Sequence, residues 1–257
     1  MKAPQCAKSP GPADSRSIAA HAILGALVAA AIQFIFGAAV SVHGATTVAT
    51  YNFTGNSLAS SDGDSNSAAA DIAVGAGLSG NAQFLTIFGN PAYGAYSDKI
   101  PGSQATPGTE SDAIAGNDYF SFTITPASGS LDYGTLNFNL EANANNIAGT
   151  YTPNISVRWS VDAFASTLTT TSITLNPGNQ SATGGSADLS SFAAQSAPVE
   201  FRFYFFDDQN ESFFTNAAID SINLTATAIP EPSSLMLFVL GGLLAAPRRT
   251  RRPAWRD

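Results

Sequence analysis

The central part of this 257-residue sequence contains neither cysteine nor histidine. Cys6, His21 and His43 are the only such residues, and all three lie within residues 1–44. The segment 45–228 therefore lacks the side chains needed for disulfides, cysteine nucleophiles and Ser-His-Asp triads. It also lacks the imidazole and thiolate ligands on which zinc and copper sites are built. Because these absences exclude most classes of hydrolase, we expect a protein that is not an enzyme.

Basic residues are scarce in the same segment. Residues 45–228 contain Lys99, Arg158 and Arg202, and these three bases against sixteen Asp and Glu residues give a formal charge of −13. Such a surface repels phosphate backbones, so we expect no nucleic-acid partner. Four of the acidic residues are glutamates, and none lies in a recognisable catalytic signature. Since paired carboxylates can support glycoside hydrolysis without histidine, a secreted glycosidase remains the enzyme alternative.

The first 44 residues have the pattern of a secretory signal peptide. The first seventeen positions contain a few scattered basic residues. The following segment, 18–42, is apolar apart from three polar residues. Small residues flank His43, which suits signal peptidase, so we predict cleavage next to residue 44. The apolar stretch is also long enough to span a bilayer, which leaves an uncleaved signal anchor as the alternative.

The C-terminal segment 229–257 combines a proline-rich motif, an apolar block and a basic end. In order these are Pro230, Glu231, Pro232 and Ser233, then the apolar block 235–246, then Arg248, Arg249, Arg251 and Arg252. Proline holds the motif extended, the block partitions into lipid as a short transmembrane helix, and the arginines stop translocation on the cytoplasmic side. The block is short against the roughly 20 residues of a spanning helix, so alone it would be a weak anchor.

This order of features resembles the PEP-CTERM sorting domain of exported bacterial proteins. The resemblance covers 229–257 and implies recognition by an exosortase, a membrane enzyme that cuts near the Pro-Glu-Pro motif in bacteria that make extracellular polysaccharide and biofilm matrix. It also implies delivery to the cell envelope membrane, followed by display at the cell surface or secretion. Two features depart from the pattern, since Pro247 precedes the arginines and 253–257 extend beyond them. A plain tail anchor behind a proline-rich linker is the alternative.

Period-two alternation of apolar and polar residues predicts an all-β ectodomain. The strand candidates are 46–53, 83–88, 120–124, 136–140, 155–161, 170–175, 199–205 and 218–226. Segments rich in Gly, Ser, Asn and Pro separate them, which is typical of an antiparallel β-sandwich or jelly roll. The segments 54–81, 89–117 and 176–196 are expected to be long loops. In 155–161, Trp159 and Val161 share one apolar face, and we expect Trp159 in the core.

Two acidic segments are candidate calcium sites. Asp62, Asp64 and Asn66 place oxygen ligands at alternate positions, like the first half of an EF-hand loop, but the glutamate required at the twelfth position is missing. Asp207 and Asp208 follow a strong strand candidate in a similarly oxygen-rich stretch. Because neither segment supplies a complete ligand set, we expect solvated acidic loops and no cofactor, with calcium as the alternative.

Tyr93 and Tyr96 are candidate sugar contacts. We expect both in a loop, where tyrosine rings could stack on the apolar C–H faces of a sugar. The sequence as a whole predicts an exported, non-enzymatic structural or interaction protein of the cell surface or extracellular matrix. A carbohydrate-binding adhesion module is the alternative, with exopolysaccharide as its partner.

Overall fold

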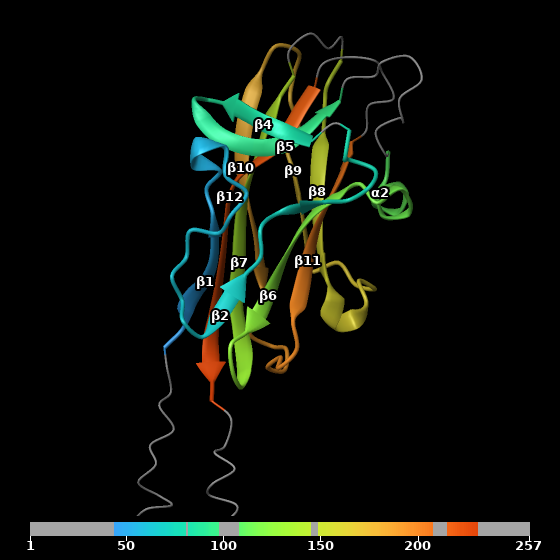
Figure 1. The fold of residues 1–257 in the computed structure, drawn as a ribbon. Coiled ribbons are helices and arrows are strands. Elements are labelled where there is room, and N and C mark those ends of the chain that lie inside the picture. The colour runs from blue at the N-terminus through green and yellow to red at the C-terminus, as the bar shows by residue number, and fades with distance from the viewer. Residues whose placement is uncertain (1–43, 81, 98–107, 145–148, 208–214, 231–257) are drawn as a thin grey trace, which may run out of the picture. The chain divides into compact units, whose positions relative to one another are not determined.

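The alternating segments of the sequence form strands, and these strands build two antiparallel sheets packed face to face (Figure 1). The computed structural model describes residues 44–80, 82–97, 108–144, 149–207 and 215–230. They fall within the compact unit Val42–Glu231, whereas the unit formed by Met1–Ser41 and Pro232–Asp257 lies outside the described residues. The predicted leader, the motif from Glu231 to Ser233 and the four arginines are therefore not described. Among the described residues, no helix combines the length and apolar character needed to cross a membrane.

Six strands form each sheet. Sheet A consists of β1 (Thr46–Tyr51), β4 (Ala82–Ile87), β5 (Asn90–Ser97), β7 (Ser130–Asn143), β10 (Gln180–Asp188) and β12 (Thr215–Ile229). Sheet B consists of β2 (Ser67–Ala69), β3 (Ala73–Val74), β6 (Tyr119–Pro126), β8 (Pro153–Trp159), β9 (Thr169–Ser172) and β11 (Val199–Asp207). This arrangement confirms the predicted all-β antiparallel sandwich.

Strand β12 is the central strand of sheet A. On one side it pairs with β7 along most of its length, and on the other it pairs with β5 near its start and with β1 near its end. Thr46 of β1 lies opposite Ala226 of β12, so the chain enters and leaves the sandwich at the same end, the lower end in Figure 1. Pro230 follows β12 directly and is exposed.

Aromatic rings join the two sheets in the core. Phe138 of sheet A meets Phe203 of sheet B edge to face, with ring centroids 5.3 Å apart, and Tyr133 meets Phe201 at 5.7 Å. Such pairs add to the stabilisation that burial of the rings already provides. Trp159 is 1% exposed and lies in the same cluster, as predicted. The predicted strand 155–161 ends at Trp159, however, because a short 3-10 helix, η2 (Ser160–Asp162), follows it.

The predicted long loops contain several regular elements. Segment 89–117 holds β5 and the helix α2 (Glu110–Gly116), segment 54–81 holds β2, β3 and the short helix η1 (Thr54–Asn56), and segment 176–196 holds β10. Strand β10 has no large apolar residue because its inner face lies close to the core. A Cβ atom at Gly185 would meet Phe138 Cζ at 2.2 Å. Because close packing leaves room only for small side chains, β10 lacks the alternation of large apolar and polar residues by which a strand is predicted.

Candidate functional site

The outer face of sheet A carries a ladder of short polar side chains. Asn137 of β7 lies between Ser186 of β10 and Asn223 of β12, and Asn139 lies between Gly184 and Ser221. We call these six positions the amide face: Asn137, Asn139, Gly184, Ser186, Ser221 and Asn223. All six are exposed or half-buried. Because the neighbours of the two β7 asparagines are small, their amides can be approached from solvent.

Glu141 continues this ladder along β7 but is buried. Its neighbours on the outer face are Ala182 and Ala218, and the residue is 1% exposed. The Asn90 side-chain amide donates a hydrogen bond to Glu141 Oε1 at 3.1 Å, whereas Oε2 receives none among the described residues. Burial raises the pKa of Glu141 to about 7; the Asn90 hydrogen bond opposes this rise and the neighbouring Asp220 carboxyl adds to it.

The hairpin formed by β4 and β5 brings Asn90 to Glu141. Its turn residues, Phe88 and Gly89, have φ values of 53° and 84°, as in the tight turns that join antiparallel strands. Ile87 beside this turn packs with Ala92 and Ala218 in a small apolar cluster separate from the main core. The hairpin lies across the upper part of the molecule in Figure 1. Phe88 is 52% exposed, which makes it an aromatic surface residue that sequence reasoning missed.

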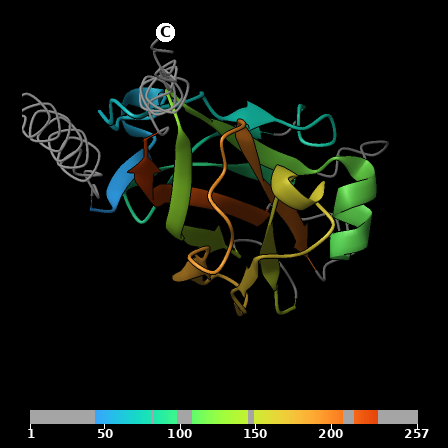
Figure 2. The same cartoon turned by 90° about the horizontal axis from the view of Figure 1, so that it is seen from below.

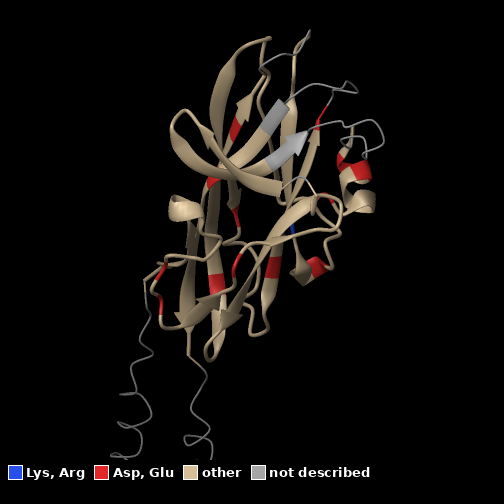
Figure 3. Cartoon of the chain, turned by 45° about the horizontal axis from the view of Figure 1, so that its top comes forward, with Lys and Arg blue, Asp and Glu red and all other residues tan. Residues whose placement is uncertain are grey.

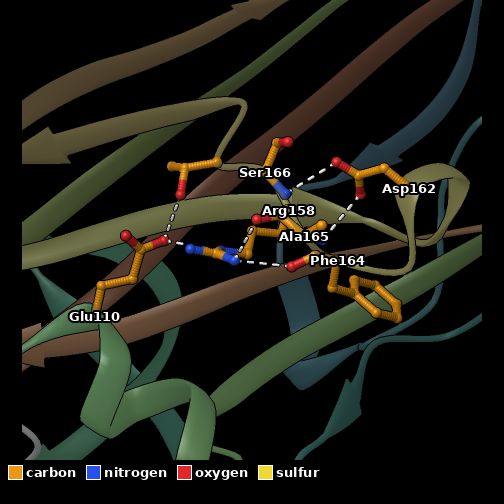
Figure 4. A network of polar contacts seen from close by, with 7 residues as sticks. Glu110, Arg158, Asp162, Phe164, Ala165 and Ser166 are labelled. Carbon is orange, nitrogen blue, oxygen red and sulfur yellow. Dashed lines mark hydrogen bonds and ion pairs between the residues drawn. The ribbon is translucent and has the colours of Figure 1, made fainter.

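A polar network ties the outer elements of sheet B together (Figure 4). Arg158 of β8 donates from Nε to Glu110 Oε1 at 2.9 Å and from Nη1 to the carbonyls of Phe164 and Ala165 at 2.8 and 3.0 Å. Thr167 donates to the same Glu110 oxygen at 2.6 Å. Burial alone would raise the pKa of Glu110, but the hydrogen bonds from Arg158 and Thr167 hold it below its usual range.

These contacts fasten α2 and the segment after η2 to strand β8. Asp162 contributes by accepting hydrogen bonds from the backbone amides of Ala165 and Ser166 at 3.2 and 2.9 Å. Figures 1 and 2 both place α2 and η2 on the same side of the sandwich. The network holds a helix and a turn against the sheet, and we assign it a structural role.

Arg202 lies directly opposite Arg158, on the neighbouring strand β11. Its guanidinium makes two hydrogen bonds to Glu200, at 2.8 and 3.3 Å, and packs over the rings of Phe164 and Tyr119, 3.8 and 4.4 Å from their centroids. Asp and Glu residues are spread over the sandwich in Figure 3, whereas Arg158 and Arg202 are the bases of its described part. Since each arginine already has its own glutamate, neither compensates the acidic residues of sheet A.

The structure removes Tyr93 as a sugar contact. The predicted loop is strand β5, and Tyr93 points into the core, 7% exposed, with ring centroids 4.9 Å from Phe84 and 4.8 Å from Phe120. A ring enclosed in this way cannot stack on a ligand. The side chain of Tyr96, also in β5, lies outside the described part of the chain, so a sugar contact there stays a prediction.

The acidic loop proposed for calcium is held by its own side chains. Asp62 accepts from the backbone amide of Asp64 at 2.7 Å, and Asp64 accepts from Asn66 Nδ2 at 3.1 Å and from Ser67 Oγ at 2.8 Å. Asp207 is the last residue of β11 and is 4% exposed, and Asp208 lies outside the described residues. Nowhere in the described ranges do three or more His, Cys, Asp or Glu side chains gather in one cluster, either in this loop or beside Asp207.

The described residues thus form an antiparallel β-sandwich with a polar outer face on sheet A. No family model matches the chain, and no curated protein matches it. Among solved structures, the chain is similar to the K3 cleaved adhesin domain of Lys-gingipain from Porphyromonas gingivalis, with a TM-score of 0.38 and 15% identity over 71% of this chain and 100% of that one.

Two carbohydrate-binding modules show a similar likeness. A mannan-recognising module has a TM-score of 0.34 and 9% identity over 71% of this chain and 98% of that one. The family 11 module of a cellulosomal cellulase of Clostridium thermocellum has a TM-score of 0.27 and 11% identity over 72% of this chain and 95% of that one. At such TM-scores and identities, none of these similarities assigns a ligand or an activity to this chain.

Proposed function

We propose that this chain is an exported, non-enzymatic surface protein whose sandwich binds polysaccharide through the amide face of sheet A. The amide face itself carries the proposal. Amide and hydroxyl groups both donate and accept hydrogen bonds, which matches the hydroxyl groups of a sugar chain. Gly184 and the serines around the two β7 asparagines leave room for a flat ligand to approach. On the β4–β5 hairpin, the half-exposed Phe88 offers an apolar ring face to a sugar.

A binding role without catalysis suits the carboxyl groups of this face. A glycosidase needs two carboxyls roughly 5 Å or more apart across its substrate. Glu141 and Asp220 interact with each other directly, and Glu141 is 1% exposed, so this pair does not leave space for a sugar or a water between its members. A secreted glycosidase therefore gains no support from the pair closest to the amide face.

Delivery to the surface is the second part of the proposal. The Pro-Glu-Pro motif begins at Pro230, immediately after β12 ends at Ile229, so no spacer separates the sandwich from the segment that resembles a PEP-CTERM signal. Signal peptidase would remove the leader and an exosortase would act on the tail. The chain enters and leaves the sandwich at one end, next to the predicted leader and the predicted tail signal.

Binding to polysaccharide is expected to depend on the asparagines of the amide face. In a panel of immobilised neutral and acidic polysaccharides, the compact unit Val42–Glu231 should bind at least one. Replacing Asn137 and Asn223 by alanine should weaken that binding about tenfold or more, since each lost hydrogen bond contributes about 1 kcal/mol. The matched control replaces the exposed Thr170 and Ser172 of sheet B by alanine and should bind normally. Absence of binding to the whole panel, or equal loss in both variants, would contradict the proposal.

Processing of the tail is expected to remove the apolar block. Mass spectrometry of the mature protein from its native host should find a C-terminus near 230–234 and no peptide from 235–246. Changing Arg248, Arg249, Arg251 and Arg252 to glutamine should reduce membrane retention and processing, because these charges stop translocation of a block that is short for a membrane span. Mature surface protein that still ends in Arg256-Asp257 would instead indicate a plain tail anchor.

A further inference from the structure

Two carboxyl groups meet on the outer face of sheet A, and no basic residue in the described part of the chain is paired with them. Glu141 and Asp220 interact directly, and Glu141 Oε2 is buried with no hydrogen-bond donor among the described residues. Arg158 and Arg202, the bases of the described chain, are paired with glutamates on sheet B. Two ionised carboxylates in contact, of which one is buried, repel each other strongly. No basic side chain of the described residues supplies the compensating positive charge, which leaves a bound cation or a proton as its source.

Two asparagine side chains and the Ser221 hydroxyl, which donates to Asp220 Oδ1 at 2.9 Å, surround this pair. Asn90 faces Glu141 Oε1 at 3.1 Å, and Asn139 faces Asp220 Oδ2 at 3.0 Å, each through its side-chain nitrogen. An asparagine amide can turn over without changing its shape, so each can present its oxygen at the same position. Four side chains from β5, β7 and β12 could then each offer a carboxylate or amide oxygen to a cation.

The backbone directs Asp220 toward this cluster. Strand β12 pairs with β7 through Ile219 and then through Ser221, and the register shift between them makes Asp220 an extra residue in the ladder. Such a bulge changes the direction of a side chain relative to the regular alternation. Asp220 thereby reaches Asn139 and Glu141, both on the outer face of β7.

We propose that Glu141, Asp220, Asn90 and Asn139 bind a calcium ion. Calcium takes six to eight oxygen ligands at about 2.3–2.6 Å and tolerates irregular geometry, which suits two carboxylates, two amides and water. Magnesium demands near-ideal octahedral coordination, and zinc prefers nitrogen and sulfur ligands that this cluster lacks. The site needs no polysaccharide and does not depend on the function proposed above, although Asn139 belongs to both.

A bound calcium ion would link the β4–β5 hairpin to the two longest strands of sheet A. Asn90 begins β5 on the hairpin, whereas Glu141 and Asp220 belong to β7 and β12.

The test compares thermal unfolding at pH 8 with and without calcium chloride, using the full chain purified in detergent and stripped with EGTA. A calcium concentration about a hundredfold above Kd should raise the Tm by about 5–10 °C. Glu141→Gln and Asp220→Asn should lose this rise and the heat of calcium binding in titration calorimetry. Without calcium, Glu141→Gln should melt above the parent protein because it removes the uncompensated charge. With calcium the order should reverse.

The matched control is Asp62→Asn with Asp64→Asn, in the acidic loop whose carboxylates are already hydrogen-bonded. This variant should keep the full calcium response. A response lost in the control but kept in Glu141→Gln would place calcium in that loop and overturn the proposal. A parent protein whose Tm does not respond to calcium, with no heat of calcium binding in calorimetry, would overturn the proposal equally.

Discussion

Trp159→Glu is expected to unfold the sandwich at temperatures where the parent protein stays folded. Trp159 is 1% exposed, and its ring centroid lies 4.5 Å from that of Phe192 and 6.1 Å from that of Phe201. The substitution removes a large apolar side chain and places a carboxylate among aromatic rings with no basic partner. Costs above roughly 4 kcal/mol follow from such changes, against a total stability of about 5–15 kcal/mol. Loss of the cooperative transition in circular dichroism melting would show the effect.

The matched control for this variant lies two residues further along the chain. Val161 would share the apolar face of Trp159 if the strand continued, but it belongs to η2 and is 39% exposed. Val161→Glu should therefore change the free energy of unfolding by no more than about 0.5 kcal/mol. Similar destabilisation by both substitutions would mean that β8 continues past Trp159 and that the end of this strand is wrong.

The difference in burial between Trp159 and Val161 shows which features of the fold the alternation pattern predicts and which it does not. Period-two patterning predicted the strands whose inner face is made of large apolar residues, and with them the antiparallel sandwich. It predicted β8 too long, because the segment after η2 is held to Glu110 of α2, far away in sequence, through Arg158 and Thr167. It missed β10, because a strand packed closely against Phe138 has room only for small side chains.

Glycine misled the prediction for Tyr93 in a similar way. Gly94 and its neighbours suggested a loop, but a Cβ atom there would lie 2.4 Å from the carbonyl oxygen of Ala217 and 2.5 Å from Ala218 Cβ. Glycine at this position allows β5 to approach β12 closely, and Tyr93 next to it then points into the core. Only the partner strand distinguishes this use of glycine from a turn.

The carboxyl pair on sheet A could be predicted only in part. Alternation along β7 correctly places Glu141 on the face that also carries Asn137 and Asn139. Its burial and its contact with Asp220 were not predictable, because they require the β7–β12 register, the bulge in β12 and the position of Asn90 on a hairpin. Sites assembled from three strands leave no spacing in the sequence by which they could be found.

Gly185→Val is expected to lower the stability of the domain, whereas Gly184→Val at the adjacent position is expected to lower only polysaccharide binding. At Gly185 a new side chain would meet Phe138 Cζ at 2.2 Å and Thr171 Oγ1 at 2.4 Å. Phe138 packs against Phe203 and cannot withdraw without disturbing the core. Overpacking of this kind costs about 3 kcal/mol, which should lower the Tm of the domain by about 6–12 °C in calorimetry.

At Gly184 nothing lies within 4 Å of the position that a Cβ atom would take, and valine is favoured in strands. Gly184→Val should therefore keep the parent Tm. Its side chain would nevertheless stand beside Asn139 on the amide face, where it would hold a flat sugar chain away from the asparagine. Polysaccharide binding should fall while the Tm stays unchanged, so the loss of binding would not result from a loss of folded protein. Undiminished binding by Gly184→Val would move the ligand to another surface, and an unchanged Tm for Gly185→Val would mean that β10 does not close this edge of the sandwich.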